Sequence, residues 1–422
     1  MRQFLQSFLA SLSREILSKY KPIIIGITGS VGKTSTKEAV FCVVSQKYKT
    51  RKSKKNFNNE IGLPLTIIGA DAPGRNVFKW IAVFFKAVLL IITPQKYPQV
   101  LVLEMGVDRP GDMDYLLSIA KPHIAIITAI GYSHYEFFKD EGSLDTEKGR
   151  IIEVLSEIDF AILNADDKRA AAQKNKTKAE VYTYGFTGQG AQITNVSENV
   201  SAPLQGVSTT FTAITKHKTF TTTLYTLGTT HISSIAAAIA TAEILNIDTQ
   251  SIANGIREYK PVPGRLNIIA GIKKSVLIDD TYNAAPDSTK TALAVLQKVP
   301  GQYKIAVLGD MLELGPISDK AHREIGKLVA SMHIQKLLTV GPSGKIIAQS
   351  AIEHGMDKDT VIMFDTSVQA GVPLQNMLPP GAIVLIKGSQ GVRMEKITKE
   401  IMAEPMRAEE LLCRQYGKWI TT

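Results

Sequence analysis

Short apolar runs alternate with helical patterns along the first half of the chain. Four of these runs have the length of buried strands, at residues 23–28, 100–103, 124–128 and 160–163. Between them, apolar residues recur every three or four positions, which is the spacing of helices. Strands that alternate with helices in this way predict a parallel sheet that helices cover on both faces.

The pattern changes between residues 181 and 226 and then returns. Threonines alternate with apolar residues at 209–212 and 220–225, which predicts a small antiparallel sheet, and an Ala-rich helical stretch follows at 233–245. Residues 259–264 contain two prolines and a glycine and are a plausible linker. A second series of strands is expected at 276–278, 304–308, 336–340, 361–364 and 383–387.

We therefore expect an α/β protein with two main domains. Residues 21–259 would form a central domain with a parallel sheet and a small antiparallel sheet, and residues 260–422 a Rossmann-like α/β domain. Residues 70–98 would be an insert in the central domain. Residues 1–20 would form an amphipathic helix, because their apolar side chains recur at helical spacing from Phe4 to Leu17.

The stretch 77–92 is unusually apolar, with Phe78, Trp80, Ile81, Val83, Phe84, Phe85 and residues 88–92. It also contains Lys79 and Lys86, and sixteen residues with two lysines are too short and too charged for a transmembrane helix. Two interpretations remain open. One is a buried helix, and the other is a helix at a membrane surface or partner, with the lysine heads reaching water.

Composition and charge narrow the class of protein. The 422 residues are 44% hydrophobic and 21% charged, which is typical of a soluble globular protein. The net charge of +10 suits anionic ligands or an anionic membrane. We expect no nucleic-acid partner, since zinc-finger spacing and a basic stripe interleaved with aromatics are both missing. Two cysteines and no clean signal peptide predict a cytoplasmic protein.

A Gly-rich loop follows the first predicted strand and leads into a helix. It contains Gly29, Ser30, Val31, Gly32, Lys33, Thr34 and Ser35. Glycines allow backbone N–H groups to surround phosphate oxygens, while the lysine would reach the β- and γ-phosphates and the threonine would bind Mg²⁺. This loop predicts nucleotide binding, but kinases, GTPases, ATPases and ligases all use it.

Further motifs follow in a fixed order, and together they resemble those of the Mur ligases. In the first half they are residues 56–66, 103–106, 131–134, 147–149 and 164–167. In the second half they are residues 263–265, 279–288, 308–315 with His322, and 387–395. The resemblance spans about residues 22–400 and is closest to the family member that adds D-alanyl-D-alanine.

This resemblance implies an ADP-forming ligase that uses ATP and Mg²⁺ in peptidoglycan synthesis. It would join D-alanyl-D-alanine to a UDP-linked muramoyl tripeptide through an acyl phosphate. Two alternatives stay open. One is a related ligase with another acceptor, such as a folylpolyglutamate-type enzyme, and the other is a membrane-docked P-loop binding protein.

The resemblance also implies the roles of individual residues. Metal binding falls to Thr34, Glu104, His134 and Lys148, the last as a carbamate, and Glu104 ends a strand at the edge of the sheet where ligands bind. Nucleotide contacts from the second domain would come from Arg265, Asp280 and Asn283. Substrate would contact Asn56, Asn58, Asn59 and Lys387. Lys33, His134, Lys148 and Lys387 would be the catalytic residues.

Some positions depart from the family pattern. Only residues 1–20 precede the predicted ATP domain, which predicts a chain without the family's N-terminal nucleotide-sugar domain. Thr230, His231 and Ser234 replace part of an expected His-Asn pattern, and Ala129 replaces an Asn. We expect a monomer, with residues 3–20 and 77–92 as the contact with a membrane or a cell-wall enzyme.

Overall fold

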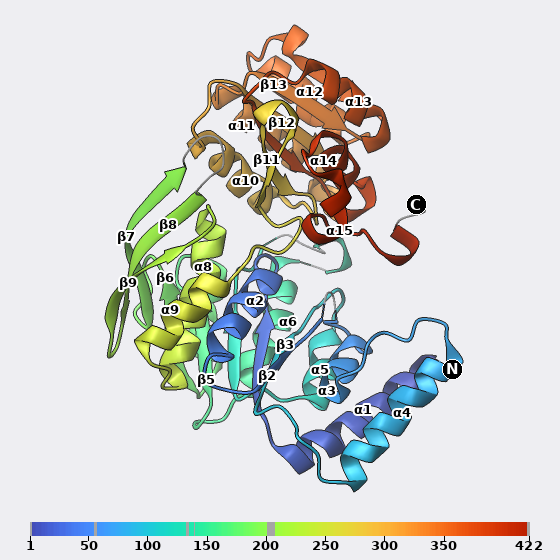
Figure 1. The fold of residues 1–422 in the computed structure, drawn as a ribbon, viewed down its shortest axis with the longest axis vertical. Helices are drawn as coiled ribbons and strands as arrows, with labels where there is room; N and C mark the ends of the chain where they lie inside the picture. Colours follow the sequence, from blue (N-terminus) through green and yellow to red (C-terminus); the bar gives the residue numbers. More distant parts are fainter. Residues whose placement is uncertain (1, 55–56, 132–134, 139, 201–206, 420–422) are drawn as a thin grey trace.

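The protein folds around two sheets with helices on both faces of each (Figure 1). The structure is a computed structural model that describes residues 2–54, 57–131, 135–138, 140–200 and 207–419. The first sheet has nine strands and belongs to residues 2–258, here called the first unit. The second has six strands and belongs to residues 265–419, the second unit. The expected α/β fold class is confirmed.

The parallel part of the first sheet forms where apolar runs predicted it. Strand β1 (Ile23–Thr28) lies between β3 (Val100–Glu104) and β4 (Ile124–Ile127). Next to β3 lies β2 (Thr50–Lys52), and beyond β4 lie β5 (Phe160–Asn164) and β6 (Glu180–Gly185). Every residue of β3 and β4 is buried, because helices cover both sides of these strands.

The Thr-rich strands extend this sheet instead of forming a separate one. Strand β7 (Ala191–Val200) pairs with the edge of β6, and β8 (Val207–Thr215) and β9 (Thr219–Leu224) follow in antiparallel order. Pairing with β7 covers the edge that β6 would otherwise expose. Phe211 and Ala213 are fully buried, while Thr210 and Thr212 form cross-strand hydrogen bonds with threonines of β9.

Two groups of helices cover the first sheet. On one face lie α2 (Lys33–Val44), α8 (Thr229–Ile244) and α9 (Thr249–Glu258), whose apolar residues share a core with Ile25 and Ile27. On the other face α3 (Gly62–Ile68), α5 (Asp112–Ile119) and α6 (Glu141–Glu153) pack against Ile24, Leu101 and Leu103. The short α7 (Lys168–Ala172) follows β5.

The second sheet is parallel apart from its first strand. Strand β10 (Asn267–Ala270) is antiparallel to β11 (Val276–Asp280). The order then runs through β15 (Ile383–Lys387), β12 (Lys304–Gly309), β13 (Lys336–Val340) and β14 (Val361–Phe364). One face is covered by α10 (Pro286–Lys298), α11 (Ser318–Ser331) and α12 (Gly344–Glu353), and the other by α13 (Ser367–Met377), α14 (Glu395–Ile401) and α15 (Ala408–Leu411).

Helices α1 (Arg2–Tyr20) and α4 (Val77–Ile92) lie side by side and project from the first unit (Figure 1). Val83, Ala87 and Leu90 of α4 are buried, whereas its opposite face is exposed. The buried-helix interpretation therefore holds for one face of α4 only. Among the described residues, no helix is both long and apolar enough to span a bilayer.

Candidate active site

The phosphate loop is shaped by two glycines with positive φ. Gly29 has φ 142°, and a Cβ at this position would lie 2.0 Å from Thr128 Oγ1, so a larger residue would clash. Gly32 has φ 90° and directly precedes α2. These two turns place the loop at the N-terminus of α2, where backbone N–H groups and the helix dipole favour a bound phosphate.

Two lysines converge on this loop from different helices. Lys33 Nζ donates to the carbonyl oxygens of Gly29 at 2.6 Å and Ser30 at 3.3 Å. Lys148, on α6 and 1% exposed, places its Nζ 3.4 Å from the same Gly29 oxygen. Burial and the nearby charge of Lys33 lower the pKa of Lys148 to about 7. At neutral pH much of this lysine is therefore a neutral amine.

Glu104 ends β3 directly beside the loop. Its Oε1 accepts hydrogen bonds from the Thr34 hydroxyl and from Asn58 Nδ2, both at 3.2 Å. Its Oε2 accepts no hydrogen bond and lies 3.4 Å from Lys37 Nζ. Burial works to raise the pKa of Glu104, but the charges of Lys37 and Lys33 outweigh it, so the pKa lies below its usual value. Glu104 is thus an anion at neutral pH.

The oxygens of Thr34 and Glu104 fit a hard divalent cation. Mg²⁺ prefers carboxylate and hydroxyl oxygens together with phosphate, and the hydrogen-bond-free Oε2 of Glu104 offers such a ligand. In the part of the chain that the structure describes, no three His, Cys, Asp or Glu side chains gather into a metal cluster. The predicted ligand His134 lies outside the described residues.

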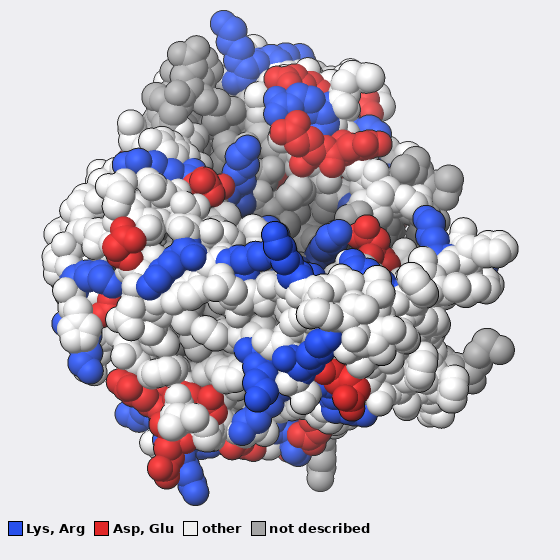
Figure 2. Space-filling view, turned by 60° about the horizontal axis from the view of Figure 1, so that its bottom comes forward, with Lys and Arg blue, Asp and Glu red and all other residues white. Residues whose placement is uncertain are grey.

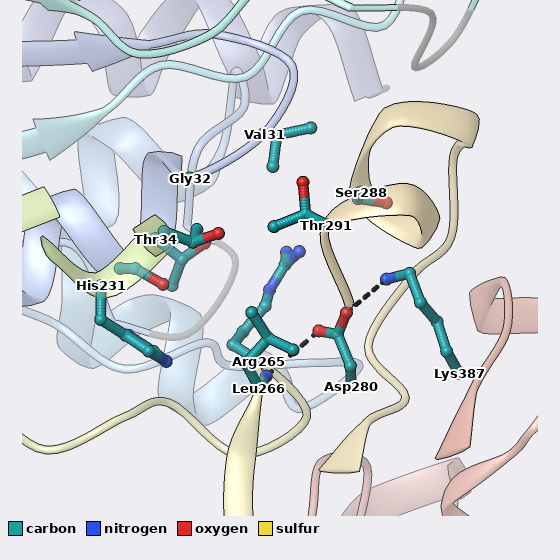
Figure 3. Close-up of a pocket in the computed structure, with 12 residues that line it drawn as sticks. Val31, Gly32, Thr34, His231, Arg265, Leu266, Asp280, Ser288, Thr291 and Lys387 are labelled. Carbon is teal, nitrogen blue, oxygen red and sulfur yellow. Dashed lines mark hydrogen bonds and ion pairs between the residues drawn. The ribbon is translucent and has the colours of Figure 1, made fainter. Parts of the chain in front are cut away.

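The second unit brings polar side chains to the same loop. Val31, Gly32 and Thr34 line a cavity together with Arg265, Asp280 and Lys387 (Figure 3). The Arg265 guanidinium points toward the loop in this view and packs over the ring of Tyr282, at 4.0 Å from its centroid. Arg265 Nε is buried without a hydrogen-bond partner, as expected for a donor that faces an anionic ligand.

Asp280 and Lys387 form a buried ion pair in this cavity. Lys387 Nζ donates to Asp280 Oδ2 at 2.6 Å and to the Asn283 carbonyl oxygen at 2.9 Å. Asp280 also accepts from the Leu266 N–H at 3.1 Å. Burial lowers the pKa of Lys387, and Asp280 opposes this effect. Asn283 lines a neighbouring cavity with Lys33 and Glu104.

We predict that Lys387→Ala destabilises the protein by about 3–5 kcal/mol, because it leaves Asp280 charged, buried and unpaired. Lys387 and Asp280 side chains are only 2% and 9% exposed. A matched control is Lys345→Ala, which breaks an ion pair with Asp365 whose side chains are 52% and 69% exposed and should cost about 0–1 kcal/mol. Urea unfolding of both variants tests this. Equal losses of stability in the two variants would show that burial does not increase the contribution of the Asp280–Lys387 pair to stability.

A further cavity of about 740 Å³, here called the second cavity, adjoins the cavity that Lys33, Glu104 and Asn283 line. Asn58, Gly106 and Asp108 line both. Asn59 lines the second cavity, and its Oδ1 also accepts from the N–H of Gly62, the first residue of α3, at 2.9 Å. The predicted substrate contact Asn56 lies outside the described residues. The second cavity provides space for a substrate beside the phosphate loop.

Several site residues escaped the sequence analysis. Lys37 follows Lys33 by one helical turn, and that spacing was the only signal for it. Trp419 lines the cavity of Lys33 and Glu104, and Arg414 donates to the Thr281 carbonyl oxygen at 3.0 Å and to that of Tyr282. Gln6 of α1 donates to Glu60 at 2.8 Å in the second cavity. Contacts between residues that lie far apart in the sequence produce no local sequence pattern that could predict them.

His231 lies at one of the positions where the sequence departs from the family pattern. It is 1% exposed, its Nδ1 lies 2.8 Å from the Tyr259 hydroxyl, and its Nε2 has no hydrogen-bond partner. Burial lowers the pKa of His231 to about 4, so the ring is neutral at pH 7. It lines the cavity of Arg265 and Asp280.

Comparison with known proteins points to one family. The model of the Mur ligase middle domain matches residues 27–78 and 86–242, and that of the Mur ligase glutamate ligase domain matches residues 264–390. The chain is 30% identical to the UDP-N-acetylmuramoyl-tripeptide–D-alanyl-D-alanine ligase of Bacillus subtilis, over 94% of this chain and 80% of that protein. Identity to the Escherichia coli enzyme of that name is 28%, over 90% and 76%.

Solved structures agree with the sequence comparison. MurF from Acinetobacter baumannii superposes with a TM-score of 0.78 at 26% identity, over 95% of this chain and 80% of that one. MurF ligase from Thermotoga maritima in complex with ADP gives a TM-score of 0.76 at 27% identity, over 94% and 83%.

Proposed function

Because this chain belongs to the Mur ligase family, we propose that it joins D-alanyl-D-alanine to UDP-N-acetylmuramoyl-tripeptide with the cleavage of ATP. The observation that supports this most is the cavity in which the phosphate loop meets Arg265, Asp280 and Lys387 of the second unit. A nucleotide bound there touches both units at once. The reaction makes an amide bond and releases ADP and phosphate, as a step of peptidoglycan synthesis.

The chemistry divides into two transfers. The terminal carboxylate of the tripeptide attacks the γ-phosphorus of ATP, which forms an acyl phosphate and ADP. The amine of D-alanyl-D-alanine then attacks the acyl carbon, phosphate leaves, and the amine proton is lost to solvent. The protein itself takes little part in the covalent chemistry. Its residues act by positioning the reactants and neutralising their charge.

Individual side chains have separate tasks in this proposal. Lys33 and the loop N–H groups bind the β- and γ-phosphates, and Arg265 binds phosphate from the opposite side. Asp280 and Asn283 orient the nucleoside, and Lys387 fixes Asp280. Asn58 and Asn59 contact the tripeptide substrate in the second cavity. Rotation about residues 259–264 would open and close the cavity between the units.

Thr34 and Glu104 would hold Mg²⁺ together with the nucleotide phosphates. His134 and a carbamylated Lys148 would provide further ligands. The ion supplies positive charge that neutralises the phosphates during transfer. Lys37 keeps Glu104 ionised and so maintains a ligand that can bind the cation.

ADP release should require both the UDP-linked tripeptide and D-alanyl-D-alanine, because the acyl phosphate turns over only when an amine removes it. A coupled assay for ADP measures this, and a folate together with L-glutamate in place of both substrates tests the folylpolyglutamate-type alternative. Turnover with the folate and L-glutamate would favour that related ligase. ATP hydrolysis that responds to neither substrate would contradict ligation and favour a P-loop binding protein.

We further propose that the chain is a cytoplasmic monomer that works at the inner face of the membrane. Residues 3–20 and 77–92 form the exposed helix pair α1 and α4 and would contact either lipid or a cell-wall enzyme. The exposed apolar side chains of this pair support the contact.

A further inference from the structure

Helix α4 exposes an apolar face that its position in the fold leaves uncovered. Of the 19 exposed large hydrophobic side chains among the described residues, eight belong to α1 and α4. They are Phe4, Phe8, Val77, Phe78, Ile81, Phe85, Val88 and Ile92. A single exposed leucine needs no explanation, but this concentration on two neighbouring helices indicates an interaction surface.

The spacing of the α4 residues places them on one side of the helix. Phe78, Ile81, Phe85, Val88 and Ile92 recur every three or four positions, and the buried Val83, Ala87 and Leu90 occupy the opposite side. The helix is therefore apolar on both sides and is packed against the core on one of them only. Phe78 is 82% exposed and Phe85 68%.

Contacts between α1 and α4 hold this surface in one piece. Phe4 stacks on Phe8, Phe8 packs against Phe84 at a centroid distance of 5.2 Å, and Phe84 stacks on Trp80. At the other end, Lys19 of α1 donates to the carbonyl oxygens of residues 90, 91 and 93. The two helices thus present a single preformed surface, here called the α1/α4 face.

Positive charge gathers around the α1/α4 face. Residues 1–21 and 72–98 contain eight Lys and Arg and one acidic residue, Glu15, so they contribute +7 of the chain's net +10. Arg14, Lys19, Lys21, Arg75, Lys79, Lys86 and Lys96 are all exposed. Across the middle of the molecule, Figure 2 shows a row of Lys and Arg side chains below a hollow.

We propose that the α1/α4 face binds the surface of an anionic phospholipid bilayer, with Phe78, Ile81 and Phe85 inserted among the acyl chains. An apolar face flanked by lysines and arginines matches both layers of such a surface, the hydrocarbon and the anionic headgroups. A protein partner of ordinary composition would need a complementary acidic rim around an apolar centre. The two segments themselves contain a single acidic residue, Glu15, and this excess of positive charge favours anionic lipid.

The second cavity lies next to the α1/α4 face. Gln6 lines that cavity, yet it lies on α1 between the exposed Phe4 and Phe8. The cavity therefore opens within about one helix diameter, roughly 10–12 Å, of the bilayer contact. A bound enzyme would hold its peptide substrate close to the membrane surface. This step rests on the proposed function, whereas the lipid contact does not.

Vesicle flotation of the full chain tests the proposal. We compare phosphatidylcholine vesicles with vesicles that also contain phosphatidylglycerol, and expect about tenfold stronger binding to the anionic ones. The variant F78S/F85S should lose about tenfold of this binding. Its control is V368S/V372S, which removes two exposed valines of α13, 66% and 52% exposed, and should bind like the wild type.

Two further measurements separate lipid from other partners. R75Q/K79Q should weaken binding to anionic vesicles only, and its control K320Q/K327Q on α11 should not. Equal binding of wild type and F78S/F85S overturns the proposal. So does a stable dimer in the absence of vesicles that F78S/F85S dissociates, since the face would then bind a second copy. ATP binding by F78S/F85S at the wild-type level shows that its fold and nucleotide site are intact.

Discussion

Lys33→Ala should lower ADP release by about a thousandfold, because it removes the ammonium group that would contact the β- and γ-phosphates. The Lys33 ammonium bonds two carbonyl oxygens of the loop itself, so it sits where phosphate oxygens would enter. Burial lowers the pKa of Lys33, while Glu104 opposes this, and bound phosphate would further favour its charged form.

The fold should survive this substitution, since Lys33 contributes charge and not core packing. Steady-state ADP release measures the loss, and thermal unfolding checks the fold. Lys121→Ala, at an exposed position before β4, serves as the control and should keep full activity. A folded Lys33→Ala enzyme with near-normal turnover would show that the Gly-rich loop is not the phosphate site.

Lys148→Ala should be nearly inactive, with a loss of about a hundredfold or more, because the side chain would act as an anionic carbamate ligand. An ammonium group buried against Lys33 and a divalent cation would be strongly repelled in this poorly screened place. Carbon dioxide adds to the neutral amine and yields a carboxylate-like group with two oxygens. Since the pKa is lowered to about 7, more neutral amine is present than in ordinary lysines.

The sign of the pH effect follows from that pKa. The neutral amine is lost as pH falls through about 7, so the carbamate and the activity should decline on the acidic side. Labelled bicarbonate should give a carbamate carbon signal in NMR that Lys148→Ala lacks. Lys176→Ala, an exposed lysine, is the control. Full activity of Lys148→Ala, or no signal in an active enzyme, would exclude the carbamate.

Most strands could be predicted because parallel sheets bury both faces. Strands β13 and β15 begin and end at the predicted residues, 336–340 and 383–387. The union of the Thr-rich strands with the parallel sheet was not foreseen, since it depends on the pairing of Tyr184 with Ala191, and pairing across strands is invisible to local periodicity. The 77–92 helix was located correctly, but its exposed face depends on what packs beside it.

The candidate site, like the fold, could be predicted from the sequence only in part. A contiguous motif gave Lys33 and Thr34, and family resemblance gave Glu104, Lys148 and Asp280, which the structure brings to one loop and its adjoining cavities. The roles of these residues stay predictions. Arg414 and Trp419 lie more than 100 residues after the Thr281–Tyr282 segment that Arg414 supports, and nothing in their own neighbourhood marks them.

Strand β1 is synthesised well before both of its neighbours in the sheet, β3 and β4. Its partners are distant in sequence, since Ile23 pairs with Val100 and Ile25 with Ile124. Until β3 has been synthesised, the run Ile23–Thr28 has neither of its neighbouring strands to pair with. Long-range parallel pairing is slow and leaves apolar segments open to aggregation. The nascent chain thus keeps this apolar run unpaired on at least one side until residue 127 has been synthesised.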